Sequence, residues 1–197
     1  MSLIANPLTE IRLKQGFRYI NQFMVLMWRL GLGRMINAWP AGTGRILILA
    51  TTGRRTGLRR LNGVNYDILN GDIYCTAGFG PESDWYRNLM VKPQAEVWLP
   101  DSWFQVSAED VTGCQGHIQI MRQVLIASGF AARLAGINPN VISDEELNRV
   151  TANYRLVKLH RAEARTGPGG PGDLAWVWPV ATLVLLLLQP TRRRRRR

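Results

Sequence analysis

The chain has 197 residues, of which 46% are hydrophobic and 20% charged, so its length and composition suit one domain with a buried core. Its formal net charge is +11, but the terminal run 192–197 supplies six of these charges and leaves +5 for the rest. Charge gathered at one end excludes a nucleic-acid-binding face spread over the domain. Nucleic-acid binding through the arginine run alone stays as an alternative, and we expect no specific nucleic-acid partner.

The two cysteines and two histidines give no sign of a metal site. Cys75 and Cys114 lie far apart, and neither they nor His117 and His160 have the spacing of metal ligands. Because the two cysteines are far apart in sequence and Cys75 falls in an apolar run, we expect both thiols to be reduced. The chain begins without the basic, apolar and small segments of a signal peptide, so we expect a cytoplasmic protein.

The first segment, 1–40, is predicted to be an amphipathic helical segment. Between residues 8 and 37 apolar side chains recur three, four or six positions apart, as on one face of a helix. Gly31 and Gly33 weaken its end, and Pro40 stops it. The stripe is rich in aromatic and methionine side chains. Packing against the domain accounts for it, and contact with a membrane surface or a lipid substrate is the alternative.

The middle of the chain, 41–165, is predicted to be one domain rich in strands. Five segments have a strand pattern: 46–50, 60–69, 72–77, 95–99 and 103–108. Asn70-Gly71 marks a tight hairpin, because both central positions of a type I′ turn need a positive φ. Strands in such close succession indicate an antiparallel barrel or sandwich.

Two helices and one more strand are expected after these strands. Residues 115–127 have helical apolar spacing. Ser143 and Glu146 have the spacing of a capping box, which starts a second helix that ends near Asn153. Residues 156–160 again resemble a strand.

The last segment, 166–197, contains a Gly/Pro-rich loop, an apolar run and the arginine tail. Residues 175–188 carry no charge. A spanning helix needs about 20 apolar residues, and Pro179 interrupts this run, so we expect a buried final strand. The alternatives are a transmembrane span and a monotopic contact in which the arginines meet anionic lipid headgroups. The arginine run alone is typical of a solvated tail.

The first candidate site is the turn Thr51-Thr52-Gly53-Arg54-Arg55-Thr56-Gly57-Leu58-Arg59-Arg60. Its glycines allow backbone amides to approach an anion closely. Arginine forks match phosphate oxygens in a bidentate way, and the Thr56 hydroxyl can add a further bond. Arg60, which opens the next strand, could reach the same anion. The alternative is a basic turn exposed to solvent.

The second candidate site follows the strand 72–77. Gly78-Phe79-Gly80 offers free backbone groups to the polar edge of a heterocycle. Trp85 and Tyr86 can flank a flat ring, and Asn88 can both donate and accept hydrogen bonds. The alternative is a loop entering a helix, with Asp84 as its N-cap and Trp85 in the core.

Taken in order, the two sites resemble a known family. Their order is similar to that of the deazaflavin-dependent nitroreductase family. It runs through a strand, T-T-G-R-[RK]-[ST]-G-x-x-R, a hairpin, a Gly-rich strand end and W-Y-x-N-L-x-x-x-P. This is the branch of the flavin and deazaflavin oxidoreductases that uses coenzyme F420, an 8-hydroxy-5-deazaflavin. The resemblance is close over 46–99 and looser over 8–111. It implies an α+β fold, a split β-barrel like that of pyridoxamine-phosphate oxidases, with peripheral helices.

The resemblance also implies an activity and a set of site residues. The activity is hydride transfer from the reduced deazaflavin to a hydrophobic, electron-poor acceptor such as a quinone, an enone or a nitro compound. The phosphate and acidic tail of the cofactor would be held by Arg54, Arg55, Thr56, Gly57 and Arg60. Its ring would lie by Ala77, Gly78, Phe79, Gly80, Trp85, Tyr86 and Asn88.

The chain departs from the family pattern between these two groups. Asn62-Gly63-Val64 stands where the family commonly has a Pro-Leu pair. Tyr66 falls near a position where some relatives have a tyrosine facing the substrate, and a tyrosine there could donate a proton. Its alternative role is that of a cross-strand packing aromatic. Tyr154 is a second, weaker candidate of the same kind.

Other functions stay open at this point. The basic turn does not distinguish F420 from FMN or FAD, because all three carry phosphate. The apolar run and arginine tail suggest a non-catalytic flavin- or deazaflavin-binding carrier at the membrane surface as the second class of function. They also suggest a cytoplasmic protein that is peripheral on the inner face of the membrane. The oligomeric state is open, with a homodimer as the candidate assembly.

Overall fold

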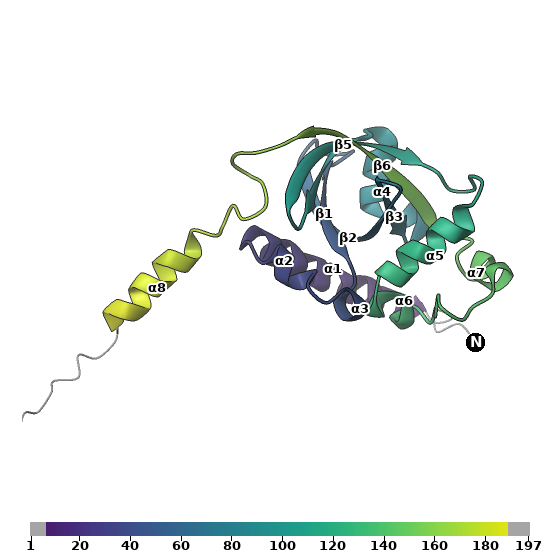
Figure 1. Ribbon diagram of the computed structural model, residues 1–197, viewed down its shortest axis with the longest axis horizontal. Helices are drawn as coiled ribbons and strands as arrows, with labels where there is room; N and C mark the ends of the chain where they lie inside the picture. The colour runs from purple at the N-terminus through teal and green to yellow at the C-terminus, as the bar shows by residue number, and fades with distance from the viewer. Residues whose placement is uncertain (1–6, 189–197) are drawn as a thin grey trace, which may run out of the picture.

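A computed structural model of the chain describes residues 7–188, with side chains from residue 16 onward, and the arginine run 192–197 lies outside this range (Figure 1). Groups of strands are separated by short helices through the central part, and a helix stands at each end. The elements in chain order are α1 (Pro7–Arg29), α2 (Gly33–Ile36), α3 (Pro40–Thr43), β1 (Ile46–Thr52), β2 (Arg59–Leu69), β3 (Asp72–Ala77), η1 (Gly80–Glu82), α4 (Asp84–Val91), β4 (Gln94–Leu99), β5 (Ser102–Asp110), α5 (His117–Ala127), α6 (Phe130–Leu134), α7 (Asp144–Val150), β6 (Arg155–Ala164) and α8 (Val177–Leu188).

The strands form a closed antiparallel barrel in the order β1-β2-β3-β6-β5-β4. Each neighbouring pair is antiparallel, including β1 with β4, which closes the barrel. Helices surround it, with α1 along one side and α5 on another (Figure 1). The predicted fold class is therefore confirmed: an α+β split β-barrel with peripheral helices.

The interior of the barrel is a packed apolar core. Alternate positions of the strands turn inward, so Leu47 and Leu49 of β1, Val97 of β4 and Val157 and Leu159 of β6 are fully buried. Burying one such side chain contributes about 1.5–3 kcal/mol relative to leaving it exposed. The barrel centre is thus occupied by side chains, and a cofactor must bind at its surface.

The hairpin predicted at Asn70-Gly71 is present, and the strand segments 95–99 and 103–108 form a second one. At the β2–β3 turn Asn70 has a φ of 53° and Gly71 a φ of 88°, as a type I′ turn requires. Strand β3 pairs back from Asp72, opposite Leu69. The second hairpin joins β4 to β5, with Leu99 opposite Ser102.

Helix α1 covers an edge of β2 where the chain departs from the family pattern. Strand β3 pairs with β2 from Tyr66 onward. Ahead of that point the backbone N–H of Gly63 donates to Oδ1 of Asn21 (2.6 Å), and Nδ2 of Asn21 donates to the carbonyl of Leu61 (3.5 Å). A Cβ at Gly63 would lie 3.4 Å from Cβ of Met24, so α1 packs directly against β2 at this point.

The capping box predicted for Ser143 and Glu146 is present in part. The hydroxyl of Ser143 accepts a hydrogen bond from the backbone N–H of Glu146 (3.2 Å), so Ser143 is the N-cap of α7. The Glu146 carboxylate does not complete the box, because it pairs with Arg149 one turn later. Residues 166–173 form a loop, as predicted.

The expectation of a buried final strand is wrong. Residues 177–188 form helix α8, which projects from the barrel (Figure 1). Periodicity alone cannot tell a buried strand from a helix in a short apolar run. The barrel closes with its six strands, and the part of β2 that β3 leaves unpaired is covered by α1, so no open edge is left for another strand. Among the helices of residues 7–188, none is both long and apolar enough to cross a membrane.

Candidate functional site

The two candidate sites meet at the side chain of Asn88. Asn88 lies in α4 and is only 4% exposed. Its Nδ2 donates to Oγ1 of Thr51 at the end of β1 (3.1 Å), and its Oδ1 accepts from the backbone N–H of Arg54 (3.1 Å). The structure thus brings the basic turn and the start of α4 together, and the Asn88 side chain bonds both the end of β1 and the turn.

Arg54 points toward α4 instead of outward. Its Nη1 donates to Oδ1 of Asp84 (2.9 Å) and to Oδ1 of Asn88 (3.2 Å), and its side chain is 18% exposed. Ser83 is the N-cap of α4, so Asp84 is the first helical residue, where a negative charge stabilises a helix. The guanidinium that sequence assigned to a phosphate is therefore already paired with a carboxylate of the protein.

Arg55 and Arg60 are exposed cations of the turn that pair with no carboxylate in the described part of the chain. Nη2 of Arg60 lies 3.4 Å from the Thr56 hydroxyl. Arg55 is exposed, and within the described part of the chain it makes no hydrogen bond or ion pair. Gly57 has a φ of 68°, which favours glycine, and the space beside its Cα is open. Two guanidinium groups and a hydroxyl thus border an open patch of backbone.

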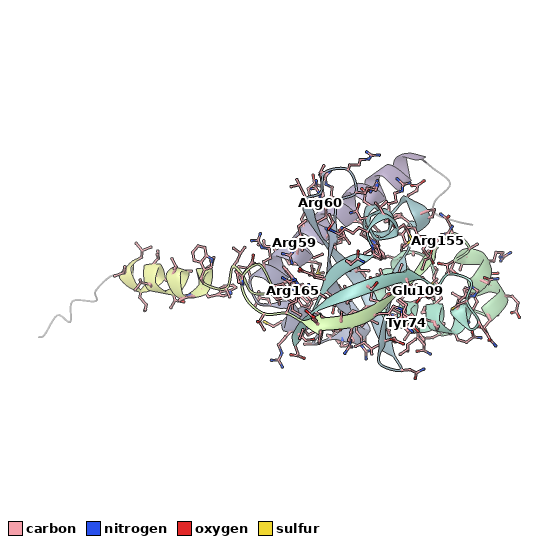
Figure 2. All side chains as sticks on the ribbon, turned by 90° about the horizontal axis from the view of Figure 1, so that it is seen from above. Arg59, Arg60, Tyr74, Glu109, Arg155 and Arg165 are labelled. Atoms are coloured by element: carbon pink, nitrogen blue, oxygen red, sulfur yellow. The ribbon has the colours of Figure 1, made fainter. Side chains whose placement is uncertain are left out.

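Arg59 belongs to a different cluster, centred on Glu96. Its Nη2 donates to Oε2 of Glu96 (2.5 Å) and its Nη1 to the carbonyl of Gly169 (2.6 Å). Nη1 of Arg165 lies 3.4 Å from Oε1 of the same glutamate, and Nε1 of Trp103 donates to it (3.2 Å). Figure 2 shows Arg59, Arg60 and Arg165 on the side of the barrel toward α8. Arg59 therefore holds the loop 166–173 rather than an anion.

The glycine-rich end of β3 packs tightly against the segment before β6. Ala77 is buried, whereas Gly78 and Phe79 are exposed. Gly80 has a φ of 56°, and a Cβ there would lie 2.1 Å from the carbonyl oxygen of Asn153, so only glycine fits. The ring of Phe79 meets the edge of Phe17 from α1 at 5.5 Å between centroids.

Of the two aromatic residues of α4, Tyr86 is a core residue. Its hydroxyl donates to Oδ2 of Asp110 on β5 (2.5 Å). Burial, followed by this hydrogen bond, raises the pKa of Tyr86. Burial raises the pKa of Asp110, but hydrogen bonds from Thr112 and Tyr86 and the charge of Arg155 outweigh it, so the net direction is downward. Trp85 is half-buried and meets the Tyr86 ring edge-on at 6.4 Å.

The two candidate tyrosines have different surroundings. Tyr66 is buried in the barrel core opposite Cys75, which favours the cross-strand packing role. Burial is the largest cause that raises the pKa of Tyr66, and the smaller effects of nearby charged groups act in both directions. Tyr154 is half-buried, and a Cβ at Gly78 would lie 3.8 Å from its ring and 3.9 Å from its hydroxyl. Burial raises its pKa too. Tyr154 is therefore the tyrosine beside the glycine-rich strand end.

Sequence reasoning missed several residues that shape the site. Phe17 and Asn21 belong to α1, and Asp110 and Asn153 come from β5 and from the segment before β6. No local motif marks them, since their positions depend on how distant segments pack. Gly80 could have pointed to Asn153, because a glycine beside an aromatic motif often marks a close backbone approach.

Comparison with protein families identifies the class of this protein. Residues 24–141 match the model of the family described as F420H(2)-dependent quinone reductase. The match covers more than half of the chain, which therefore belongs to this family. The protein is a deazaflavin-dependent oxidoreductase, and its cofactor is coenzyme F420. Membership favours F420 over FMN or FAD and an enzyme over a carrier.

Three solved structures with some likeness to this chain are distant from it in sequence. A conserved hypothetical protein from Mycobacterium tuberculosis is 18% identical, with 68% of this chain and 80% of that chain covered and a TM-score of 0.47. The heme storage protein HutZ from Vibrio cholerae is 13% identical over 71% and 94%, with a TM-score of 0.46. An F420-H2 dependent reductase, FDR-A, is 17% identical over 59% and 94%, with a TM-score of 0.44. No curated protein matches the chain. The family assignment rests on the family model alone.

The donor set of the turn fits an anionic cofactor tail. Arg55, Arg60 and Thr56 offer exposed donors around Gly57, which has open space where a side chain would be. Guanidinium groups that have no carboxylate partner can pair with phosphate in a bidentate way. Arg54 does not fit in the same way, because its guanidinium already has Asp84 as its partner.

Proposed function

We propose that this enzyme reduces a quinone and binds F420 across the basic turn and the glycine-rich end of β3. When bound, reduced F420 supplies a hydride, which is two electrons and a proton. A quinone that takes up this hydride and one further proton becomes a hydroquinone, so electrons and protons balance. The observation that carries the proposal is the Asn88 side chain, which joins the two parts of the site through Thr51 and Arg54.

In this proposal the cofactor tail is bound by Arg55, Thr56 and Arg60. Arg54 has a positioning role: its ion pair with Asp84 fixes the turn against the first residue of α4. Charge-assisted hydrogen bonds contribute about 1.5–3 kcal/mol each when formed. Because Arg55 and Arg60 are exposed, the lower part of this range applies to them.

The ring end of the site is formed by the segment after β3. Gly78 leaves room for a flat ring beside Tyr154, and Trp85 stands half-buried at the start of α4. The aromatic pair Phe17 and Phe79 is partly exposed and gives an apolar surface on which a quinone can pack. Tyr154 is protonated at neutral pH, since burial raises its pKa, and in this proposal it donates the further proton.

The test is a titration of F420 against four proteins: wild type, Arg55→Ala with Arg60→Ala, Arg54→Ala, and Arg149→Ala. We expect the double variant to bind F420 about 10- to 100-fold more weakly, from roughly 1.5–3 kcal/mol of lost interaction. Arg149 on α7 is an exposed arginine paired with Glu146 and serves as the matched control, which should bind as wild type does.

The Arg54→Ala variant separates binding from positioning. If Arg54 positions the turn, its removal should lower both the stability of the protein and its affinity for F420. The urea unfolding midpoint of Arg54→Ala should then fall, whereas the midpoint of the double variant Arg55→Ala, Arg60→Ala should not. Equal affinity of wild type and the double variant would overturn the assignment of the turn. A Tyr154→Phe variant whose quinone reductase activity and pH profile match wild type would remove Tyr154 from the proposal.

A further inference from the structure

Helix α8 is apolar on every side and has no covering in the described part of the molecule. None of its residues is buried. From Trp176 onward, nine large apolar side chains are 47% to 76% exposed: Trp176, Trp178, Val180, Leu183, Val184, Leu185, Leu186, Leu187 and Leu188. A helix with apolar side chains all round belongs in a protein core or in lipid. Figure 1 shows α8 projecting away from the barrel, so the barrel core is not its place.

The polar side chains of α8 are already satisfied within the helix or at its attachment. The hydroxyl of Thr182 donates to the carbonyl of Trp178 (2.9 Å), as is common for hydroxyls in apolar surroundings. Pro179 stands in the first turn, where its missing N–H costs little. No charged side chain lies between Asp173 and the end of the helix at Leu188. Immersion in hydrocarbon would therefore bury no unpaired charge.

We propose that α8 is a membrane anchor that inserts into one leaflet of an anionic bilayer. Its 12 residues span about 18 Å, less than the roughly 30 Å of a hydrocarbon core. An interfacial helix is immersed by about 5–10 Å, close to the helix diameter of about 10–12 Å. Such a helix can bury most of its apolar surface in one leaflet while both of its ends stay near the headgroups.

The two ends of α8 carry the residues suited to that position. Trp176 and Trp178 stand at its beginning, and tryptophan is enriched at membrane–water interfaces. In the sequence, the arginine run 192–197 follows the helix within four residues. Each basic residue near an anionic membrane surface contributes about 1 kcal/mol to binding. Two copies of this chain joined through parallel α8 helices would bring two arginine runs near each other, whereas anionic lipid attracts them, so charge favours lipid over such a pair.

The beginning of α8 is fastened to helix α1, so insertion would orient the whole barrel. Arg29 forms a forked ion pair with Asp173, with Nη2 to Oδ2 at 2.8 Å and Nε to Oδ1 at 3.0 Å. The backbone N–H of Leu174 donates to the carbonyl of Arg29 (2.8 Å), and Nε1 of Trp178 donates to that of Leu30 (2.9 Å). These bonds bridge about 145 positions of sequence at the place where the anchor leaves the domain.

The test is flotation of the purified full-length protein with vesicles of phosphatidylcholine alone or mixed with phosphatidylglycerol. We expect wild type to float with the mixed vesicles. The double variant Leu185→Asp, Leu186→Asp should bind them at least tenfold more weakly, because carboxylates in hydrocarbon are costly. The matched control is Leu134→Asp, Val141→Asp, which places the same charges on exposed apolar positions of α6 and its following loop and should float as wild type does.

Each remaining outcome decides the proposal. Replacement of 192–197 by serine should lower binding to the mixed vesicles by at least tenfold, and binding should fall as salt is raised. Wild type that stays unbound to both vesicles would overturn the proposal. A second result would also overturn it: wild type is an oligomer in solution, the Leu185→Asp, Leu186→Asp variant is a monomer, and both float equally well. Helix α8 would then pack against a second copy of the chain instead of lipid.

Discussion

Asn88 donates a hydrogen bond of 3.1 Å to the hydroxyl of Thr51, and this bond joins helix α4 to the end of strand β1 across 37 positions of sequence. Both side chains are buried. The Asn88 carbonyl oxygen turns the other way and accepts from the backbone of Arg54 (3.1 Å). One amide thus sets the position of the basic turn relative to the helix that follows the glycine-rich strand end.

Replacement of Asn88 by alanine is therefore expected to loosen the site as well as the fold. It leaves the Thr51 hydroxyl and the Arg54 N–H without their partners in a buried place, a loss of about 1–3 kcal/mol in the free energy of unfolding. F420 affinity should fall in parallel. Urea unfolding and an F420 titration measure the two effects. The control is Asn148→Ala, which removes an exposed amide from α7 and should change neither.

The bond between Tyr86 and Asp110 predicts a pH-dependent stability. The net lowering of the Asp110 pKa means that this carboxyl contributes stability above its unfolded pKa of about 3.9 and loses it as pH falls through the folded value. Tyr86→Phe removes one of the lowering bonds. Because Asp110 is largely exposed, we expect a loss of only about 1 kcal/mol at pH 7, and less at pH 3.

Urea unfolding of wild type and Tyr86→Phe at pH 7 and pH 3 checks this expectation. The raised pKa of Tyr86 has no influence in this range, since a tyrosine stays protonated well below its unfolded pKa of about 10. A stability difference that is the same at both pH values would show that the Asp110 carboxylate is not the partner that matters.

The positions of the strands up to β5 and the β2–β3 hairpin could be predicted because their signals are local, whereas the pairing of β1 with β4 could not. The Asn70-Gly71 turn fixes the β2–β3 hairpin, and the alternation of buried positions fixes which face of each strand turns inward. The secondary structure of residues 175–188 was harder to predict, because a run of valine and leucine suits a strand or a helix equally. What decides between them is the closure of the barrel, which is a property of all six strands together.

The order and spacing of the two motifs predicted that they form one candidate site, and the structure brings the two segments together. The partner of each side chain was not predictable, because it depends on contacts between segments far apart in sequence. Arg54 and Arg55 are adjacent and chemically identical, yet only Arg54 has a carboxylate beside it. Nothing local in the sequence distinguishes the two, because Asp84 is 30 positions away.

Gly80 should be intolerant of any side chain. Its φ of 56° makes a side chain there conformationally unfavourable, and a Cβ would lie only 2.1 Å from the Asn153 carbonyl oxygen. Gly80→Ala must therefore both strain its own backbone and displace the backbone of Asn153. Gly113 has a φ of 82° but open space around it, so Gly113→Ala measures the conformational cost alone, about 1–2 kcal/mol. We expect Gly80→Ala to lower the free energy of unfolding by clearly more than Gly113→Ala does. If urea unfolding shows equal losses in the free energy of unfolding for the two variants, the segment around Asn153 moves aside without cost.

Glu96 should control the local opening of the loop 166–173. Glu96→Gln removes the negative partner of Arg59 and Arg165 but keeps an acceptor for Trp103. Partly exposed ion pairs contribute about 0–1 kcal/mol each, so amide exchange in peptides covering 166–176 should become several-fold faster. Hydrogen exchange with mass spectrometry measures this. Glu163→Gln, at an exposed position of β6, is the control and should leave the rate unchanged.

The proposed anchor and the proposed quinone reductase activity together predict how the enzyme reaches a lipid-soluble acceptor. The Leu185→Asp, Leu186→Asp variant alters only α8, so its kcat/KM for menadione in solution should match wild type within twofold. With a long-chain quinone dissolved in phosphatidylglycerol-containing vesicles, we expect its rate to fall at least fivefold, because the variant no longer concentrates on the membrane. F420 oxidation followed by absorbance measures both rates. A parallel loss with both quinones would point to damage in the domain, and equal rates on vesicles would show that α8 has no part in acceptor delivery.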